Sequence, residues 1–344
     1  MTHWISSIIL EHGLPDDEGV GKMLLRAIDL KGGYAIRSGF VKAVDGCSLT
    51  LSEGEILGII GESGCGKSTL GKLLMGFTMP PLKLLNGKAL IEEIDLYSYD
   101  LEDRRRFWGS LISMMPQYSM NALNPTMKIK DFIYDFLKHH KRDITREEAL
   151  EIASDRLKSL NLSPNVLDMY PFELSGGMKQ RVVIMVSTLL NPKTLICDEP
   201  TSALDVSTQR VLLELLYNMV KLEKIVSSMI IISHDVAAIS QICDTLYVMY
   251  AGKIVEKGSL NDIVEEPLHP YTKALISSVL TPEERVRRGK ITGLKGAPPD
   301  LLNPPVYCRF AARCPSAFSK CKQAEPPLIR IGNREVACWL FSGE

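Results

Sequence analysis

Residues 61–69 read Gly61-Glu62-Ser63-Gly64-Cys65-Gly66-Lys67-Ser68-Thr69 and follow an apolar run at residues 55–60. They fit the pattern G-x-x-x-x-G-K-[ST] between a buried strand and a helix, which predicts a P-loop. Its glycines let successive backbone N–H groups point at phosphate oxygens, and the helix dipole favours the same anion. We expect Lys67 to reach the β- and γ-phosphates and the Ser68 hydroxyl to ligate Mg²⁺. A chance glycine-rich turn is the alternative, but the full match in this context predicts nucleotide binding.

The composition predicts a globular protein with a large core, because 45% of the 344 residues are hydrophobic. Lys and Arg total 40 against 41 for Asp and Glu, so no overall positive charge is available to hold a nucleic-acid backbone or an anionic membrane. No apolar stretch approaches the ~20 residues of a membrane-spanning helix, and no signal peptide is evident. We therefore expect a soluble, cytoplasmic protein.

The pattern along the chain predicts an α/β fold in three parts. We expect a loose N-terminal extension at residues 1–22, a nucleotide-binding domain at residues 23–265, and a small, proline-rich, cysteine-containing C-terminal appendage at residues 266–344. Within the domain, residues 24–54 predict an antiparallel β layer, and near-continuous apolar strands predict a mostly parallel core sheet. A helical insert is expected from about residue 108 to residue 191.

Two helices are predicted within the insert. Thr145 and Glu148 form a capping-box signature before the first, and the second is expected at residues 175–190. Apolar strands at residues 194–197 and 229–233 then restore the βαβ rhythm of a parallel sheet.

Two acids and a histidine follow predicted strands. Asp198 and Glu199 end an apolar strand, where Asp198 is suited to hold Mg²⁺ and Glu199 to polarise a water for attack on the γ-phosphate. Taken alone, the pair could equally be a solvated turn, but the P-loop upstream favours the functional interpretation. His234 follows the next strand, at the sheet edge where ligands bind in α/β folds, although a lone histidine there is usually structural.

A second glycine-rich element, Ser175-Gly176-Gly177, also opens a predicted helix. Its hydroxyl, its N–H groups and the helix dipole form a second anion site. It lies more than a hundred residues from the P-loop and inside the helical insert. We therefore expect two chains, facing head to tail, to bring the two elements to one phosphate.

The eight cysteines divide into a scattered and a clustered set. Cys47, Cys65, Cys197 and Cys243 are scattered and are expected to be inert. The clustered set is Cys308, Cys314, Cys321 and Cys338, with five, six and sixteen residues between successive members. In a reducing compartment this cluster favours metal binding over disulfides. Four thiolates suit tetrahedral Zn²⁺ or a [4Fe–4S] cluster, so the spacing leaves zinc, iron–sulfur and structural thiols open.

Six motifs in order resemble those of ATP-binding-cassette ATPases across residues 24–265. They are Walker A at residues 61–69, the Q-loop at Gln117, the signature at residues 174–178, Walker B with its catalytic Glu at residues 195–199, the D-loop at residues 202–205, and the switch histidine His234. The signature has Met178 where many members have Gln, but Ser175 and its two glycines are unchanged.

The resemblance implies one combined site for nucleotide, Mg²⁺ and the attacking water. Nucleotide contacts are implied for Tyr34, Gly61, Ser63, Gly64, Cys65, Gly66, Lys67, Ser68, Thr69, Ser175, Gly176, Gly177 and Asp205. Mg²⁺ contacts are implied for Ser68, Gln117 and Asp198, and catalytic roles for Lys67, Gln117, Glu199 and His234. Tyr34 falls where the family places an aromatic that stacks on adenine, with Phe40 as a competitor.

The resemblance narrows to the oligopeptide/dipeptide/nickel importer branch at residues 117–125, 269–275 and 308–315. Some members of this branch carry a [4Fe–4S] cluster in the tail, so the resemblance favours that cluster, with Zn²⁺ as the alternative, on the four clustered cysteines.

The branch implies an ATP-hydrolysing subunit that dimerises on ATP and drives a membrane importer for peptides or similar small solutes, with oligosaccharide or nickel as other cargo. Its implied partners are a second ATPase chain, identical or related, two transmembrane permease subunits, and an extracytoplasmic solute-binding protein. The implied location is the cytoplasmic face of the membrane, with no nucleic acid bound. The alternative is a cassette ATPase that acts on nucleic acid or the ribosome, against which the near-neutral charge counts.

Overall fold

The computed structural model describes residues 21–117, 123–202, 204–279 and 296–342, so nearly all of the predicted N-terminal extension lies outside the described residues. The strands are β1 Met23–Ile36, β2 Gly39–Ser52, β3 Ile56–Ile60, β4 Leu82–Ile91, β5 Ile94–Asp95, β6 Ile112–Met115, β7 Thr194–Asp198, β8 Ser228–Ser233, β9 Thr245–Tyr250, β10 Lys253–Ser259, β11 Ile329–Ile331 and β12 Arg334–Val336. The α-helices are α2 Lys67–Leu74, α3 Leu101–Arg104, α4 Ile129–His140, α5 Arg146–Ser159, α6 Gly176–Thr188, α7 Val206–Lys221, α8 Val236–Ile239, α9 Leu260–Glu265 and α10 Pro270–Val279.

The central sheet has eight strands in the order β11-β12-β10-β9-β3-β8-β7-β6. The strands from β9 to β6 run parallel, as predicted for the core. Their apolar side chains alternate between two hydrophobic clusters: Leu195 and Cys197 of β7 belong to one, and Ile196 belongs to the other. Because both faces are apolar, both must be covered.

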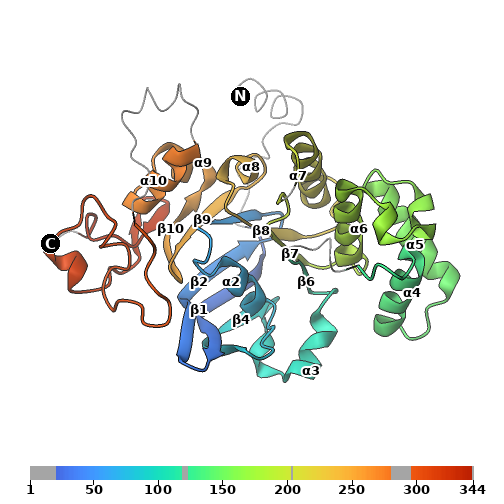
Figure 1. The fold of residues 1–344 in the computed structure, drawn as a ribbon, viewed down its shortest axis with the longest axis horizontal. Helices are drawn as coiled ribbons and strands as arrows, with labels where there is room; N and C mark the ends of the chain where they lie inside the picture. The colour runs from blue at the N-terminus through green and yellow to red at the C-terminus, as the bar shows by residue number, and fades with distance from the viewer. Residues whose placement is uncertain (1–20, 118–122, 203, 280–295, 343–344) are drawn as a thin grey trace.

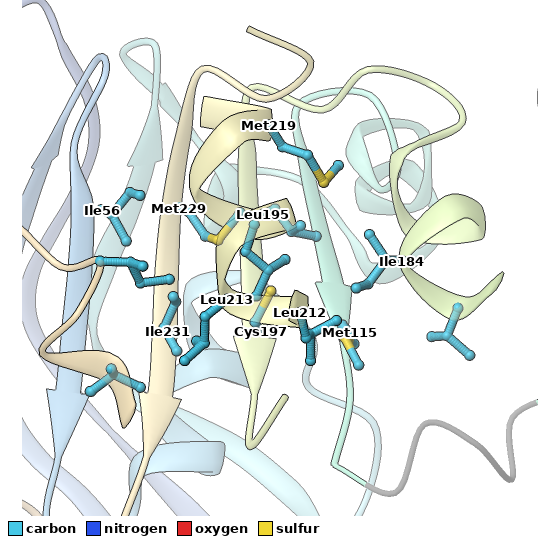
Figure 2. Close-up of a cluster of buried hydrophobic side chains, with 14 of the residues drawn as sticks. Ile56, Met115, Ile184, Leu195, Cys197, Leu212, Leu213, Met219, Met229 and Ile231 are labelled. Atoms are coloured by element: carbon cyan, nitrogen blue, oxygen red, sulfur yellow. The ribbon is translucent and has the colours of Figure 1, made fainter. Parts of the chain in front are cut away.

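Different layers cover the two faces. On one face, Ile184 of α6 and Leu212 of α7 belong to the same cluster as Leu195 and Met229 of the sheet (Figure 2). On the other face lie α2 and a four-stranded antiparallel sheet with the order β2-β1-β4-β5. This second sheet confirms the predicted β layer, and the cluster that it shares with α2 holds the P-loop helix between the two sheets.

The helical insert differs from its predicted range at the start. The sequence placed it from about residue 108, but β6 pairs in parallel with β7 and so belongs to the central sheet. The short, mostly apolar stretch at residues 111–115 suits a buried strand and a buried helix equally well. Its periodicity therefore could not show whether it forms a strand or the start of the helical insert. The predicted capping box is confirmed: the Thr145 hydroxyl accepts the Glu148 N–H, and the Glu148 carboxylate accepts the Thr145 N–H.

The C-terminal segment, described at residues 266–279 and 296–342, extends the central sheet. β12 pairs with β10, where Val336 lies opposite Glu256, and β11 pairs with β12. Residues 296–342 lie beside β10 and α10, at the opposite end of the molecule from α4 and α5 (Figure 1). Phe310, which is buried, belongs to the same hydrophobic cluster as Leu195 of the central sheet. β10 and β12 lie on either side of residue 266 in the sequence, yet they pair in one sheet. The predicted boundary between a nucleotide-binding domain and an appendage at residue 266 therefore stays a prediction.

In the described part of the chain, no helix is long and apolar enough to span a membrane.

Candidate nucleotide-binding site

The P-loop connects β3 to α2 and passes very close to neighbouring backbone. Gly66 has φ of 108°, and a Cβ there would lie 1.9 Å from the Ala43 carbonyl oxygen. A Cβ on Gly61 would lie 2.1 Å from the Met249 carbonyl oxygen. Only glycine fits at these two positions, since the obstacle is backbone that cannot rotate away. The loop is thus fixed by its surroundings as well as by its own sequence.

Lys67 and Ser68 begin α2 and point to different partners. The buried Lys67 ammonium donates to the carbonyl oxygens of Gly61, at 2.7 Å, and Glu62, at 3.0 Å, so it lies along the loop. The Ser68 hydroxyl donates to Asp198 Oδ1 at 3.0 Å. The fold therefore brings Asp198, the acid that ends β7, to the P-loop, across 130 residues of sequence.

Asp198 and Ser68 fit a magnesium site on chemical grounds. Asp198 is only 2% exposed. Burial raises the pKa of its carboxyl group and the Glu199 carboxylate adds to the rise, whereas the Ser68 hydrogen bond lowers it. A divalent cation favours the charged carboxylate and would offset that cost of burial. A hydroxyl and a carboxylate oxygen are also ligands that Mg²⁺ prefers.

Glu199 and His234 meet at the ends of adjacent strands. His234 Nδ1 lies 2.8 Å from Glu199 Oε2, and the Glu199 side chain is 8% exposed, against 65% for His234. Glu199 has φ of 52°, and its N–H donates to the Ile232 carbonyl oxygen at 2.8 Å. This left-handed backbone turn is unusual for a glutamate and is a feature of functional sites. The buried Glu199 carboxylate is therefore held in place by the His234 imidazole, which faces solvent.

Gln117 is the last described residue before the gap at 118–122, and it is exposed. It follows β6, whose Met115 is in register with Cys197 of β7. The carboxyl ends of parallel strands lie at one edge of a sheet, so Gln117 starts at the same edge as Asp198 and Glu199. Its predicted contacts with Mg²⁺ and water stay predictions.

Tyr34 lies in β1 against the P-loop helix. Its hydroxyl is 3.1 Å from the Thr69 hydroxyl oxygen, and the side chain is half-buried. Phe40, the alternative adenine-stacking residue, pairs with Ala35 across the β1–β2 hairpin. The hydroxyl contact gives Tyr34 a second role, which is to join the antiparallel sheet to α2. Stacking on adenine stays a prediction.

The signature element lies apart from the P-loop. Ser175 caps α6, where its hydroxyl accepts the Met178 N–H at 3.3 Å, and both Ser175 and Gly176 are exposed. Figure 1 shows α6 beside α5, apart from α2. Within this chain the signature instead adjoins the D-loop, because Gly177 and Leu204 line one hollow of about 160 Å³. The described residues of one chain therefore do not bring the signature to the P-loop.

Asp205 caps the helix that follows the D-loop. Its Oδ1 accepts the N–H groups of Ser207 and Thr208, each at 3.0 Å, and its Oδ2 accepts the Thr208 hydroxyl at 2.7 Å. The Ser207 hydroxyl also donates to Asp205 Oδ1. This hydrogen bond has the largest effect, and together with the others it holds the pKa of Asp205 well below its usual range. In this chain the residue is an N-cap, and its predicted contact with nucleotide remains untested. Ala203 of the D-loop lies outside the described residues.

Sequence reasoning missed a set of contacts from the C-terminal segment to the P-loop. The Arg313 guanidinium makes two hydrogen bonds to the Glu62 carboxylate, at 2.7 and 2.9 Å, and the Tyr271 hydroxyl accepts the Glu62 N–H at 2.8 Å. The partners are 251 and 209 residues apart in sequence. No local pattern could have predicted them. The only signal was that both residues lie in stretches that resemble the importer branch.

The four clustered thiols lie near one another. Burial raises the pKa of the Cys308 thiol to about 11, and the other three thiols add to the rise. Burial likewise raises the pKa of Cys314 and Cys338, with smaller contributions from cysteines of the same cluster. Three of the sulfurs accept backbone N–H groups, each from the residue two positions farther on. Among the described residues, however, no group of three or more His, Cys, Asp or Glu is placed to hold a metal ion. The predicted ligand set is thus not confirmed.

The scattered cysteines are buried, as expected for inert thiols. Burial raises the pKa of Cys47 to about 12, and burial also raises that of Cys65, Cys197 and Cys243. Cys65 stays protonated even though Lys67 lies nearby and opposes the effect of burial.

A phosphate-binding loop with its lysine, two strand-end acids and a histidine at one edge of a parallel sheet defines the class of P-loop nucleoside triphosphatases. Two family models narrow the class. One, described as "ABC transporter", matches residues 44–202, and one, described as "Oligopeptide/dipeptide transporter, C-terminal region", matches residues 255–321. The chain belongs to the ATP-binding-cassette transporter ATPases that carry this C-terminal region. Members of this family hydrolyse ATP to power transport.

Similar curated proteins cover nearly the whole chain. A "Dipeptide transport ATP-binding protein DppD" of Caldanaerobacter subterraneus is 40% identical over 321 residues, which are 93% of this chain and 97% of that protein. An "Oligopeptide transport ATP-binding protein OppF" of Salmonella typhimurium is 38% identical over 327 residues, 92% of this chain and 96% of that one. The predicted family is therefore confirmed, and these relatives do not favour the nucleic-acid alternative.

Solved structures confirm the mixed α/β cassette fold. A dimeric, post-hydrolysis structure of the ATP-binding cassette MJ0796, bound to ADP and Pi, matches with a TM-score of 0.61 at 23% identity, covering 69% of this chain and 99% of that one. The structure of cbiO1 from Clostridium perfringens, part of the transporter complex cbiONQ, matches with a TM-score of 0.59 at 25% identity, covering 71% of this chain and 92% of that one.

Proposed function

We propose that this chain is the ATP-hydrolysing subunit of an importer for peptides or similar small solutes. The observation that carries the proposal is the meeting of Ser68 with Asp198 and of Glu199 with His234 at one sheet edge. The names of the relatives, which are transport ATP-binding proteins for dipeptides and oligopeptides, support the class of cargo. Oligosaccharide and nickel remain as other cargo within the same branch.

Each residue of the edge has a proposed role in hydrolysis. Lys67 and the P-loop N–H groups bind the β- and γ-phosphates, and Glu199 takes the proton of the attacking water. His234, through its contact with Glu199, orients that carboxylate. Ser68 and Asp198, with Gln117, hold Mg²⁺, which when bound neutralises charge on the phosphates.

We propose that the complete site is shared between two chains. The signature residues Ser175, Gly176 and Gly177 of one chain would face the P-loop of the other, as a two-fold dimer allows. The exposure of Ser175, which caps α6, and the separation of α6 from α2 support this arrangement. The solved MJ0796 cassette is a dimer, which supports the arrangement by analogy. The partner chain is either a second copy or a related ATPase.

Mixing two inactive variants tests the shared site. Lys67→Ala disables the P-loop and Ser175→Arg blocks the signature, so each variant alone should lose ATPase activity. In a mixed dimer one of the two sites keeps both intact halves, and random pairing should restore about a quarter of the wild-type rate. Asn165→Arg, on the same insert, is the control and should stay active. Activity of the mixture no higher than that of the two variants alone would overturn the shared site.

We propose that the chain acts as a peripheral subunit at the cytoplasmic face of the membrane, together with two permease subunits and an extracytoplasmic solute-binding protein. Co-expression with membrane proteins encoded by neighbouring reading frames, followed by affinity purification, tests this assembly. Recovery of two permeases, and ATPase activity that rises when the loaded solute-binding protein is added, is the expected result. An ATPase that purifies alone under these conditions would contradict it.

For the four clustered cysteines we propose a [4Fe–4S] cluster, with Zn²⁺ as the alternative. The N–H groups directed at three of the sulfurs support cluster ligation, because such hydrogen bonds accompany it. Burial and the repulsion from the other three thiols raise the pKa of Cys308, and a bound metal would offset that repulsion by favouring the thiolates. Anaerobic purification with iron, zinc and visible absorption measured together distinguishes the two. Cys338→Ser should lose the metal, while the control Cys243→Ser should retain it. Wild-type protein that contains neither iron nor zinc would refute the proposal.

A further inference from the structure

Glu62, the second residue of the P-loop, is held at every polar atom. Its N–H donates to the Tyr271 hydroxyl, and its carbonyl oxygen accepts Lys67 Nζ at 3.0 Å and the Cys65 N–H at 3.3 Å. Its two carboxylate oxygens accept one hydrogen bond each from Arg313. Two of these partners, Tyr271 and Arg313, lie outside the cassette motifs. A residue fixed at both backbone groups and at its side chain determines the path of the loop on either side of it.

The contact between Arg313 and Glu62 has the geometry of a strong ion pair. Both terminal nitrogens of the guanidinium are used, so the planar fork matches the carboxylate. The Arg313 side chain is 5% exposed and that of Glu62 is 27% exposed, so water screens the pair little. Arg313 also donates to the Tyr250 hydroxyl at 3.2 Å, at the end of β9.

An aromatic cluster anchors the C-terminal side of this contact. The rings of Tyr250 and Tyr271 are 4.6 Å apart between centroids, and Phe310 lies 5.2 and 5.5 Å from them. The Phe310 carbonyl oxygen accepts the Arg313 N–H at 2.9 Å. One short turn therefore joins Arg313 to the buried Phe310. This turn fixes the backbone of Arg313, and with it the position from which the guanidinium reaches Glu62.

Charge gives this contact a second consequence. The P-loop binds a polyphosphate, and an unpaired carboxylate one residue after Gly61 would repel it. Arg313 neutralises that carboxylate from outside the loop, and Tyr271 fixes the adjoining N–H. Neither residue needs to touch the nucleotide to affect its binding.

We propose that Arg313 and Tyr271 are positioning residues that hold the P-loop in its binding conformation through Glu62, so that the C-terminal segment sets the affinity for ATP. The proposal rests on the proposed ATPase function and extends it. Arg313 lies between Cys308 and Cys314, so the segment that carries the clustered cysteines is the same segment that holds the loop.

Steady-state kinetics and equilibrium binding of ATP test the proposal. Arg313→Met should raise the KM and Kd for ATP about tenfold, while kcat changes less than threefold. Arg330→Met, an exposed arginine of the same segment, is the matched control and should behave as wild type. The double variant Glu62→Gln/Arg313→Met should bind ATP more tightly than Arg313→Met alone, because the repelling charge has been removed. A purely structural role for Arg313 does not predict that rescue.

Three outcomes would overturn the proposal: an unchanged KM in Arg313→Met, a loss confined to kcat, or additive effects in the Glu62/Arg313 cycle. If Arg313→Met does not fold, Arg313→Lys and Tyr271→Phe serve instead, since each keeps the bulk of the side chain and loses the fork or the hydroxyl. Both should then raise KM, and an unchanged KM in both would overturn the proposal. ATP hydrolysis by the wild-type chain is measured in the same series, and its absence would count against the proposed function alone.

Discussion

Acidification should destabilise this protein through the buried histidine His269. Its side chain is 2% exposed, and Nδ1 accepts the Tyr271 N–H at 3.0 Å at the start of α10. Burial lowers the pKa of His269 from 6.5 to about 3. Protonation would place a charge beside Phe310 and convert the acceptor nitrogen into a donor, which breaks the hydrogen bond to Tyr271.

The size of the effect follows from the two pKa values. Between pH 6.5 and pH 3 the unfolded chain binds a proton at His269 that the folded chain does not, so stability falls as pH falls. Each pH unit in that window costs about 1.4 kcal/mol, which gives a loss of about 2 kcal/mol between pH 6.5 and pH 5. The contribution is essentially unchanged above pH 7, where both states are neutral at this residue.

Urea unfolding at pH 7 and pH 5 measures the effect, with His269→Asn as the variant. Asparagine keeps an acceptor at a helix N-terminus but does not titrate, so its free energy of unfolding should fall about 2 kcal/mol less than that of wild type. Buried Glu256, which accepts the His269 N–H, has its pKa raised by burial. Its neutral form therefore contributes stability at low pH that is lost as pH rises, and this contribution is common to both proteins.

His139→Asn, the same substitution at an exposed position, is the control; because burial, and to a smaller extent His139, lowers the pKa of the neighbouring His140, only a small change in the pH dependence is expected. An equal loss of stability in wild type and His269→Asn would refute the reasoning.

Three further predictions concern Glu199 at the edge of the parallel sheet, Phe310 of the aromatic cluster, and the clustered thiols. Glu199→Gln should lower kcat by about 10²–10⁴-fold while ATP still binds, as measured by steady-state rates and equilibrium binding; undiminished turnover would exclude Glu199 as the base. Phe310→Ala should lower the free energy of unfolding by about 3–5 kcal/mol in urea titrations, because the side chain is fully buried, and a change below 1 kcal/mol would contradict that packing. In protein stripped of any bound metal, Cys308 and Cys314, which are half-buried, should react with a thiol reagent before Cys197, and faster as pH rises, since burial raises their pKa; mass spectrometry of labelled peptides at pH 7 and 9 would reveal the opposite order.

The local parts of the nucleotide site could be predicted from the sequence because each depends on a short pattern. A glycine-rich loop between an apolar strand and a helix specifies its own backbone path, and acids or a histidine directly after apolar strands must emerge at one edge of a parallel sheet. The structure bears this out in the contacts of Ser68 with Asp198 and of Glu199 with His234. The capping box at Thr145 was predictable for the same reason, since its partners are three residues apart.

Other features depend on which distant segments pack together, and only the tertiary structure decided them. The sequence pattern of β6 suits a helix or a strand, and its parallel pairing with β7 makes it a strand of the central sheet. The addition of β11 and β12 to the central sheet depends on β10 offering an open edge. The contact of Arg313 with Glu62 joins residues 251 positions apart. Its strength comes from burial and orientation, which no local pattern encodes. The sequence by itself determined that this chain has a phosphate-binding loop, and the packing of the C-terminal segment determined how that loop is held.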